Sequence, residues 1–395
     1  MNDVSELQEM LWKDPYPLYR LLRSEGRATW SDFPRGWLVP HYADVVDVLR
    51  DPRLGAHVDE GRDMVKRVRI SPELDRHYRQ TLFFMDPPAH TRVRDPVRHA
   101  FTPRKAARLA PRIEAIANEL IDEVVASGSI ELIGDFAYPL PVRVIAELLG
   151  VPDGDLPLLK RWSDDTAVLL VEPFKTQEQV DRSEVSLAEM RRYFGAVFVE
   201  RRAAPSDDLI SELVALGSQT LDDDQLFALV SLILVAGHET TTNLIGNSVL
   251  SLLRDPEARA FLENDPTRIP AAVDELLRFE SPVQVAQRVA REDCVVVGQE
   301  VKRGDRLYTL LGSANRDEAT FPDPDRLDFE RGDIRHVAFG QGIHFCLGAS
   351  LARLEGGIAL QTLLRRLPGL KADFETPVWR KQVVLRGLEH LSLRF

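Results

Sequence analysis

Cysteine is scarce in this sequence, which contains only Cys294 and Cys346. Two cysteines cannot build the disulfide framework of a small secreted domain, so a reducing compartment is expected. The first residues carry neither the basic stretch nor the apolar core of a secretory signal peptide. We therefore expect a cytoplasmic protein, with Cys294 as an inert residue on a strand.

Long apolar runs and an excess of basic residues are also missing. The longest apolar run, from Leu226 to Gly237, is about a dozen residues long and is interrupted by Ser231, too short to span a bilayer. The formal net charge of −12 disfavours nucleic acid and anionic membranes as main partners. We expect no membrane anchor and no nucleic-acid partner.

The composition is that of a globular protein with a large core, with 44% hydrophobic and 28% charged residues. A length of 395 residues would allow two or three domains. However, the chain shows no repeat, no low-complexity tract and no convincing linker between independent domains. We expect a single domain over residues 1–395.

Periodic apolar residues predict a mainly helical chain. The predicted helices cover residues 14–22, 41–50, 105–127, 139–149, 153–171, 178–202, 221–254 and 269–279. Strands are predicted at 36–39, 283–289, 294–298 and 307–311. Residues 53–80 are expected to be exposed loop with room for one helical turn, and the tail after Leu370 to form short strands with an exposed loop at 386–390.

The most informative stretch is the loop from Phe339 to Gly348, which surrounds Cys346 with three glycines. Glycines let a backbone turn tightly and approach a flat ligand closely. A helical pattern begins directly after Gly348, and the start of a helix favours a thiolate over a thiol. We interpret Cys346 as a metal-binding thiolate. The alternative is a structural buried cysteine beside a glycine-rich turn.

The predicted helix 221–254 is roughly 50 Å long and has an unusual middle. Gly237, Glu239 and three threonines stand inside an otherwise apolar helix, at a cost in helix propensity. The zinc-protease pattern H-E-x-x-H begins at His238 but fails, because Thr242 occupies the second histidine position. Such a conflict between local propensity and a buried setting is typical of a functional site.

Together these stretches resemble the cytochrome P450 family, in particular its soluble bacterial members. Four motifs carry the resemblance in the family's order: Ala236-Gly237-His238-Glu239-Thr240-Thr241, Glu275-x-x-Arg278, Arg326 within Pro324-Asp325-Arg326, and Phe339-x-x-Gly342-x-x-x-Cys346-x-Gly348. The last motif is highly specific, and the resemblance covers essentially the whole chain. It implies one mainly α domain with a smaller β-rich region and haem between the long helix and the cysteine loop.

The resemblance also implies residue roles. Cys346 is expected to be the thiolate ligand of the iron in haem b (iron protoporphyrin IX). The other residues expected to contact haem are Phe339, Gly340, Gly348, Ala236 and Gly237 beside the macrocycle, and His90, Arg94, Arg288 and His344 at its propionates. By spacing alone, His90 and Arg94 would be a solvated surface pair four residues apart, followed by Pro96, which should kink or end their helix.

Further roles follow from the same resemblance. Thr240 and Glu239 match the family's acid–alcohol pair, which delivers protons to oxygen. Glu275, Arg278 and Arg326 match a buried charge network that supports the haem-binding core. The residues expected to line an apolar substrate pocket are Phe83, Phe84, Val235, Val283, Val285 and Leu388.

The expected reaction is insertion of one atom of dioxygen into a lipophilic small molecule, by hydroxylation or epoxidation. Electrons are expected from a separate ferredoxin and its reductase. The ferredoxin could dock on a basic patch, for which the candidate residues are Arg98, Arg104, Lys105, Arg108, Arg112 and Arg353. The alternative is that these residues are scattered solvated charges that form no docking patch. Fatty acids, terpenoids, steroids and polyketide macrolides all stay open as substrates. The alternatives are a peroxygenase or nitric oxide reductase on the same fold, and a non-catalytic haem-thiolate binding protein.

Overall fold

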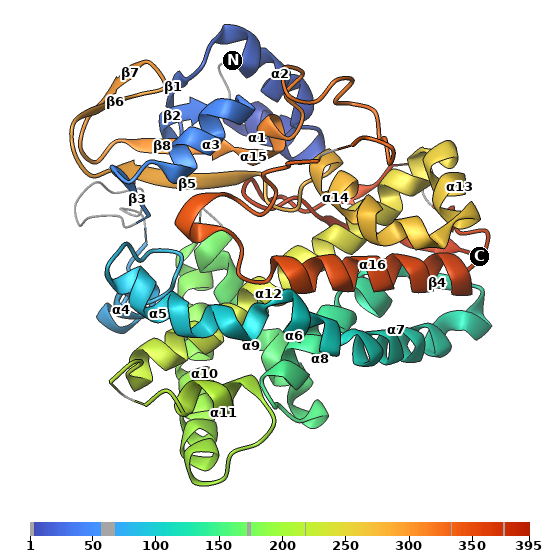
Figure 1. Cartoon of the computed structure of the whole chain (residues 1–395), viewed down its shortest axis with the longest axis horizontal. Helices are drawn as coiled ribbons and strands as arrows, with labels where there is room; N and C mark the ends of the chain where they lie inside the picture. The colour runs from blue at the N-terminus through green and yellow to red at the C-terminus, as the bar shows by residue number, and fades with distance from the viewer. Residues whose placement is uncertain (1–3, 57–67, 172–174, 218, 333, 374–375) are drawn as a thin grey trace. The chain divides into compact units, whose positions relative to one another are not determined.

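The computed structural model describes residues 4–56, 68–171, 175–217, 219–332, 334–373 and 376–395. The chain forms two compact units. Unit 1 comprises Met1–Leu54, Ala106–Leu140 and Thr240–Phe395, and unit 2 comprises Gly55–Lys105 and Pro141–Glu239. Figure 1 labels the elements of both units along the chain.

Helices make up most of the described chain. The α-helices are α1 (Val4–Lys13), α2 (Tyr16–Glu25), α3 (Tyr42–Arg50), α4 (Pro72–Arg79), α5 (Ala89–Arg98), α6 (Pro103–Arg108), α7 (Ala110–Val124), α8 (Pro139–Leu148), α9 (Leu156–Val171), α10 (Gln177–Ala203), α11 (Leu209–Val214), α12 (Asp223–Arg254), α13 (Pro256–Asn264), α14 (Ile269–Phe279), α15 (Leu311–Ala314) and α16 (Ala349–Arg366). Short helical turns are η1 (His99–Phe101), η2 (Val125–Ser127), η3 (Ile133–Ala137), η4 (Asp153–Asp155), η5 (Pro266–Arg268) and η6 (Gly342–His344).

The strands are short and lie mainly in unit 1. They are β1 (Thr29–Asp32), β2 (Arg35–Val39), β3 (Leu54–Gly55), β4 (Ser129–Glu131), β5 (Val285–Ala290), β6 (Cys294–Val296), β7 (Gln299–Val301), β8 (Arg306–Leu310), β9 (Lys371–Ala372), β10 (Val378–Trp379), β11 (Leu388–His390) and β12 (Ser392–Arg394). The largest sheet has the order β1-β2-β8-β5-β3. The smaller sheets are β4-β12-β9, β10-β11 and β6-β7.

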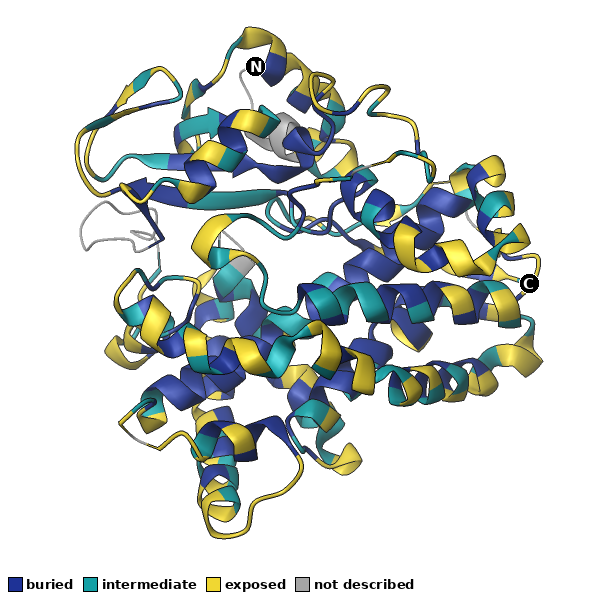
Figure 2. Ribbon diagram, in the orientation of Figure 1, coloured by how far each residue is buried: buried dark blue, intermediate teal, exposed yellow. Residues whose placement is uncertain are grey.

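In the main sheet, β8 runs parallel to β2 and antiparallel to β5, with Leu307 opposite both Trp37 and Arg288. Because β8 has a strand on either side and helices packed on it, its apolar run is buried almost throughout. Helix α3 packs on the sheet through Val45 and Val48. Figure 2 shows β5 and β8 mostly in the buried and intermediate colours, while the β6-β7 hairpin carries exposed residues.

The longer helices of unit 1 include α7, α14, α16 and the second half of α12. Helix α16 lies against α12 at Gly356, where a Cβ atom would come within 2.8 Å of the Leu244 side chain. In unit 2, α10 begins with a capping box between Thr176 and Gln179. It packs along α9, where the rings of Trp162 and Tyr193 lie 5.4 Å apart, edge to face.

Helix α12 is long and apolar enough to cross a membrane by length and composition alone. However, 83% of its most apolar window is buried inside the structure. This is the pattern of a core helix, because a membrane helix would expose its apolar surface.

The prediction of a mainly α fold with a smaller β-rich region is confirmed. Pro96 lies inside α5, which ends two residues later at Arg98. Two local predictions were wrong. Residues 72–79 form helix α4, since Ser71 accepts from the backbone of Leu74 as an N-cap; residues 57–67 of that predicted loop lie outside the described residues. The tail at 385–388 is buried, and 388–390 is strand β11.

Candidate active site

The backbone of the cysteine loop is fixed by hydrogen bonds and by one obligatory glycine. The N–H of Cys346 donates to the carbonyl of Phe339 at 2.9 Å. Gly342 has a φ of +73°, and a Cβ atom there would lie 2.7 Å from the carbonyl oxygen of Leu49. Any other residue would be strained and would collide with α3. The loop therefore presents a half-buried cysteine, which forms no disulfide, three residues before the first residue of α16.

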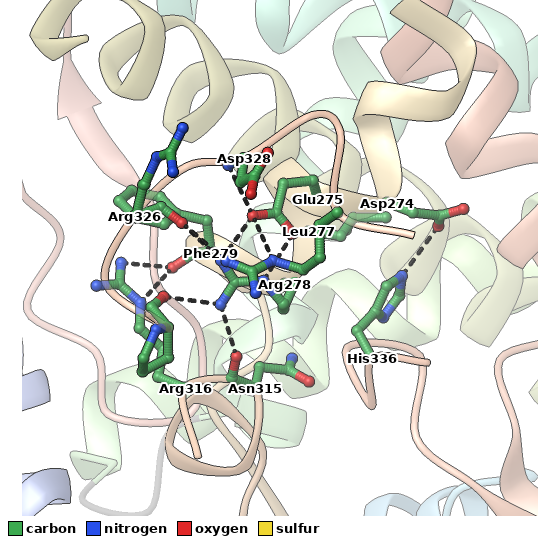
Figure 3. Close-up of polar contacts among 12 residues, drawn as sticks. Asp274, Glu275, Leu277, Arg278, Phe279, Asn315, Arg316, Arg326, Asp328 and His336 are labelled. Atoms are coloured by element: carbon green, nitrogen blue, oxygen red, sulfur yellow. Dashed lines mark hydrogen bonds and ion pairs between the residues drawn. The ribbon is translucent and has the colours of Figure 1, made fainter. Parts of the chain in front are cut away.

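Asp274 on α14 ties together the two ends of this loop. Its carboxylate accepts from His336 Nε2 at 2.9 Å, before the loop, and from Arg353 Nε at 2.7 Å, after it. Burial raises the pKa of Asp274, but His336 and Arg353 outweigh it and hold that pKa below its usual value. The Arg353 guanidinium also lies 4.6 Å from the centre of the Phe339 ring. Figure 3 shows His336 pointing at Asp274.

Asp274, His336 and the loop role of Arg353 were missed by the sequence reasoning. Asp274 and His336 are 62 residues apart, so no local spacing joins them. Arg353 was considered only as a surface charge for docking. The one available signal was that Asp274 directly precedes Glu275, the first residue of the motif Glu275-x-x-Arg278.

The middle of α12 has one accessible strip. Between Gln225 and Leu252 every residue is buried except Ala236, Gly237 and Thr240. These three are spaced i, i+1 and i+4 and therefore share one face of the helix. At Gly237 a Cβ atom would lie 2.6 Å from Ile145 of α8, so close helix packing also requires this glycine.

His238 and Glu239, next to the strip, are buried within unit 2. The Nδ1–H group of His238 donates to the carbonyl of Leu234 at 2.9 Å, and Ser163 Oγ lies 3.3 Å from the same nitrogen. Burial lowers the pKa of His238, although the Glu239 carboxylate, 3.8 Å from Nε2, acts against this. Among the described residues, no group of three or more histidine, cysteine, aspartate or glutamate side chains could hold a metal ion.

The residues of the cysteine loop fit a haem group. Haem iron needs only one protein ligand, and Cys346 is a cysteine outside any disulfide close to a helix start. At Gly348 no atom of the described residues beyond its chain neighbours and local helix backbone lies within 4 Å of the Cβ position, so a flat ligand has room beside the loop. Gly340 has a φ of +69° and helps the loop to turn. Arg288 is buried on β5, and His344 is half-buried in η6.

The remaining predicted residues lie as follows. In unit 2, His90 is buried on α5 with Arg94 one turn later, Val235 is buried on α12, Phe84 is half-buried, and Phe83 is exposed. In unit 1, Val283 lies just before β5 and Val285 is the first residue of β5; both are half-buried. Leu388 is buried at the start of β11.

Glu275 and Arg278 form a fully buried ion pair (Figure 3). Arg278 donates to both carboxylate oxygens of Glu275 at 2.7 Å. Its remaining N–H groups reach backbone carbonyls, including those of Asn315 at 2.9 Å and Pro324 at 2.8 Å. The guanidinium is thus satisfied on every side, as a buried charge requires.

The expectation that the Arg326 side chain joins this network was wrong. The backbone N–H of Arg326 donates to the Asp323 carbonyl at 3.0 Å, in a turn that leaves the Arg326 side chain exposed. Only its carbonyl takes part, accepting from Arg278 at 3.1 Å. The second guanidinium belongs to Arg331, whose Nε lies 3.3 Å from the Glu275 carboxylate.

Glu355, on α16, is a buried carboxyl with no charged partner among the described residues. Its Oε2 atom accepts no hydrogen bond there, and burial raises its pKa from 4.5 to about 8. The group is therefore protonated at neutral pH in the folded chain but ionised in the unfolded chain. Its contribution to stability is complete below pH 4.5 and is lost as the pH rises towards about 8.

Glu355→Gln removes this pH dependence. Between pH 5 and pH 7.5, the unfolding free energy of the variant is expected to gain about 3 kcal/mol relative to that of the wild type. Denaturant titrations at both pH values measure the change. The matched control is Glu300→Gln, at an exposed position of strand β7, and an equal gain in that control would contradict the assignment to Glu355.

Comparison with known proteins places this geometry in a family. The Cytochrome P450 family model matches residues 176–370. Cytochrome P450 107B1 of Saccharopolyspora erythraea is 42% identical over 373 residues, covering 91% of this chain and 89% of the relative. Vitamin D(3) 25-hydroxylase of Pseudonocardia autotrophica is 38% identical over 392 residues, covering 97% and 94%. The crystal structure of P450BioI in complex with hexadec-9Z-enoic acid ligated acyl carrier protein has a TM-score of 0.92 at 35% identity, covering 100% of both chains.

These similarities extend over nearly the whole chain and include proteins named as hydroxylases. Membership implies haem as the cofactor, redox partners that donate electrons, and lipophilic substrates. The cysteine loop, the accessible strip on α12 and the buried ion pair of α14 are all consistent with that assignment. This chain therefore belongs to the cytochrome P450 family and is an oxygen-incorporating monooxygenase.

Proposed function

We propose that this protein uses haem b, dioxygen and electrons from a separate ferredoxin and its reductase to hydroxylate or epoxidise a lipophilic small molecule. The observation that carries the proposal is the geometry at Cys346, a cysteine outside any disulfide that is held by its own backbone in a glycine-rich loop before α16. Haem bound through a cysteine thiolate supplies the iron chemistry that activates dioxygen. The chain itself provides the ligand, the anion partners and the protons.

The proposed haem contacts follow the chemistry of the side chains. Cys346 holds the iron, with Phe339, Gly340 and Gly348 beside it on the loop and Ala236 and Gly237 on the accessible strip of α12. Haem propionates are anions and need cationic or hydrogen-bonding partners. The four residues proposed for this role are His90, Arg94, Arg288 and His344.

We assign proton delivery to Thr240 and Glu239. Thr240 is the only hydroxyl residue on the accessible strip of α12. Glu239 is a buried carboxyl next to His238, whose pKa is lowered by burial. In this proposal the hydroxyl of Thr240 donates a proton at the reaction site, and the carboxyl of Glu239 replaces that proton.

Thr240→Ala is expected to keep haem but to uncouple the reaction. Without the hydroxyl, product per electron pair should fall by about ten-fold or more, a typical loss for a missing acid–base group, while hydrogen peroxide rises. Parallel measurements of product, peroxide and reductant consumption give the coupling. Thr241→Ala is the matched control, because that neighbouring side chain is buried off the strip. Fully coupled product formation in Thr240→Ala would refute the role.

The proposed substrate class is lipophilic, since the candidate pocket residues carry only apolar side chains: Phe83, Phe84, Val235, Val283, Val285 and Leu388. Two relatives support this class, one named for vitamin D(3) and one solved with a hexadecenoic acyl chain. A spectral binding screen across fatty acids, steroids, terpenoids and macrolides, followed by product analysis, tests it. Ligands that shift the haem spectrum and are converted exclude a non-catalytic binding protein.

A cytoplasmic location and a ferredoxin partner belong to the same proposal. Four of the six candidate docking residues are already ion-paired: Arg98 with Asp95, Lys105 with Glu212, Arg112 with Glu119, and Arg353 with Asp274. These pairs favour scattered surface charges over a concentrated basic patch. Turnover with dioxygen and a ferredoxin–reductase pair, compared with turnover on peroxide alone, separates a monooxygenase from a peroxygenase. Reduction of nitric oxide, measured with the same electron donors, tests the nitric oxide reductase alternative.

A further inference from the structure

Two segments far apart in the sequence are joined in unit 1. The N–H of Gln284 donates to the carbonyl of Val384, and the N–H of Arg386 donates to that of Pro282, both at 2.8 Å. Between them, Val283 and Leu385 form an antiparallel bridge. The segment 282–284 contains the proposed pocket residue Val283. The segment 384–386 is followed two residues later by the proposed pocket residue Leu388.

The side chain of Arg386 locks this junction through a buried ion pair. Its Nε donates to the carboxylate of Glu280, which also accepts from the hydroxyl of Tyr16 at 2.6 Å. The guanidinium lies 3.6 Å from the centre of the Trp379 ring and donates to the carbonyl of Trp12 at 3.0 Å. Trp379 in turn pairs with Leu388 across β10 and β11. One arginine therefore contacts both chain segments and their flanking strand.

Both charges of the pair persist at neutral pH. Burial raises the pKa of Glu280, but Arg386 and Arg316 outweigh it and hold that pKa below its usual value. Arg316 rests 3.7 Å from the centre of the Tyr16 ring and donates to the carbonyl of Phe279. Ion pairs buried in this way have a defined geometry, because every donor is directed at a fixed acceptor.

The same junction is anchored to α12. Asn247 Nδ2 donates to the carbonyl of Arg386 at 2.9 Å. A Cβ atom at Gly387 would lie 1.8 Å from Asn243 Oδ1, so the backbone touches the helix at this point. Asn243 and Asn247 follow Thr240 by three and seven residues. They therefore lie on the same face of α12 as Thr240, about one and two turns further along. The junction is therefore held at a fixed position relative to Thr240.

We infer that Glu280 and Arg386 are positioning residues that set how far the substrate-pocket wall formed by Val283 and Leu388 stands from Thr240, and so determine which substrates fit. The inference rests on the proposed function, which assigns these residues to the pocket. Neither Glu280 nor Arg386 touches the reacting atoms in this account. They act through the segments that they join.

Azole binding tests the inference without requiring the natural substrate. Imidazole and clotrimazole both bind haem iron through a ring nitrogen, but only clotrimazole carries aryl groups bulky enough to meet the pocket wall. Two variants are compared, Arg386→Met and the double variant Glu280→Gln/Arg386→Met, which leaves no unpaired carboxylate. In both, the ratio of the clotrimazole and imidazole dissociation constants is expected to change by about ten-fold.

The control is Asp44→Asn, which breaks the ion pair of Arg27 and Asp44 in the main-sheet region of unit 1. Its ratio should stay within about two-fold of the wild type, a change of roughly 0.4 kcal/mol. If the ratio of the two dissociation constants is unchanged in both test variants, the ion pair has no effect on the pocket and the inference is overturned. If the ratio changes equally in Asp44→Asn, the effect is a general loss of stability and the inference is also overturned.

Hydrogen exchange separates this inference from the proposed function. Peptides that cover 281–287 and 383–389 are expected to exchange faster in both variants and at wild-type rates in Asp44→Asn. This readout needs no haem. If the wild-type protein bound no azole, the proposed function would fail while the exchange data still decided the positioning role. Unchanged exchange in both variants would contradict the inference.

Discussion

Replacing Cys346 by serine is expected to abolish the thiolate-type spectrum of the reduced carbon monoxide complex and all monooxygenase activity. A serine hydroxyl is not ionised near neutral pH and cannot replace the electron-rich thiolate that favours cleavage of the O–O bond. The loop itself should survive, because its hydrogen bond to Phe339 and the contact at Gly342 use only backbone atoms. Difference spectra of the purified protein measure the effect.

Cys294→Ser provides the matched control for this experiment. Cys294 is the second of the two cysteines, half-buried on β6, and burial raises the pKa of its thiol. Its replacement should leave the spectrum and the activity unchanged. A thiolate spectrum that persists in Cys346→Ser, or disappears in Cys294→Ser, would show that Cys346 is not the ligand.

Arg278→Met is expected to destabilise the protein by about 3–5 kcal/mol, because it leaves the carboxylate of Glu275 buried without its main partner. Both side chains are fully buried, and Arg331 contacts Glu275 with only one nitrogen, at 3.3 Å. Haem content should fall as well, since α14 also carries Asp274, which holds both ends of the cysteine loop. Denaturant unfolding and the haem-to-protein ratio measure the two effects.

The comparison for this variant is Arg98→Met. Arg98 pairs with Asp95 at the same i,i+3 spacing but on an exposed part of α5. Its replacement should change the unfolding free energy by less than about 1 kcal/mol. Similar losses in the two variants would mean that burial does not determine the importance of the Glu275–Arg278 pair.

Local sequence signals predicted the elements that carry the site. Helix α14 has the predicted bounds, Ile269 to Phe279, because Pro270 begins it and its apolar residues keep a helical period. The long helix α12 was predicted to within two residues at its start, since its buried residues and acidic first turn are both local features. Cys346 stood out for a local reason too, namely its glycines and the helix that follows.

Features that depend on distant contacts could not be predicted in the same way. Nothing in the sequence distinguishes Arg331 from Arg326 as the partner of Glu275, because the choice depends on how the coil from 321 to 331 turns. Asp274, His336 and Arg353 meet only after α14, the loop and α16 have packed together. The segment 385–388 contains an arginine and a glycine and was expected to be exposed, yet Glu280 satisfies the arginine charge.

We expect this chain to insert an oxygen atom from dioxygen into a lipophilic substrate at a haem held by Cys346. The most direct test is turnover under isotopically labelled dioxygen, with a ferredoxin and its reductase, on a compound that shifts the haem spectrum. We predict a product that carries one labelled oxygen atom and loss of this product in Cys346→Ser. An unlabelled oxygenated product, or an equal amount of labelled product from Cys346→Ser, would contradict the account.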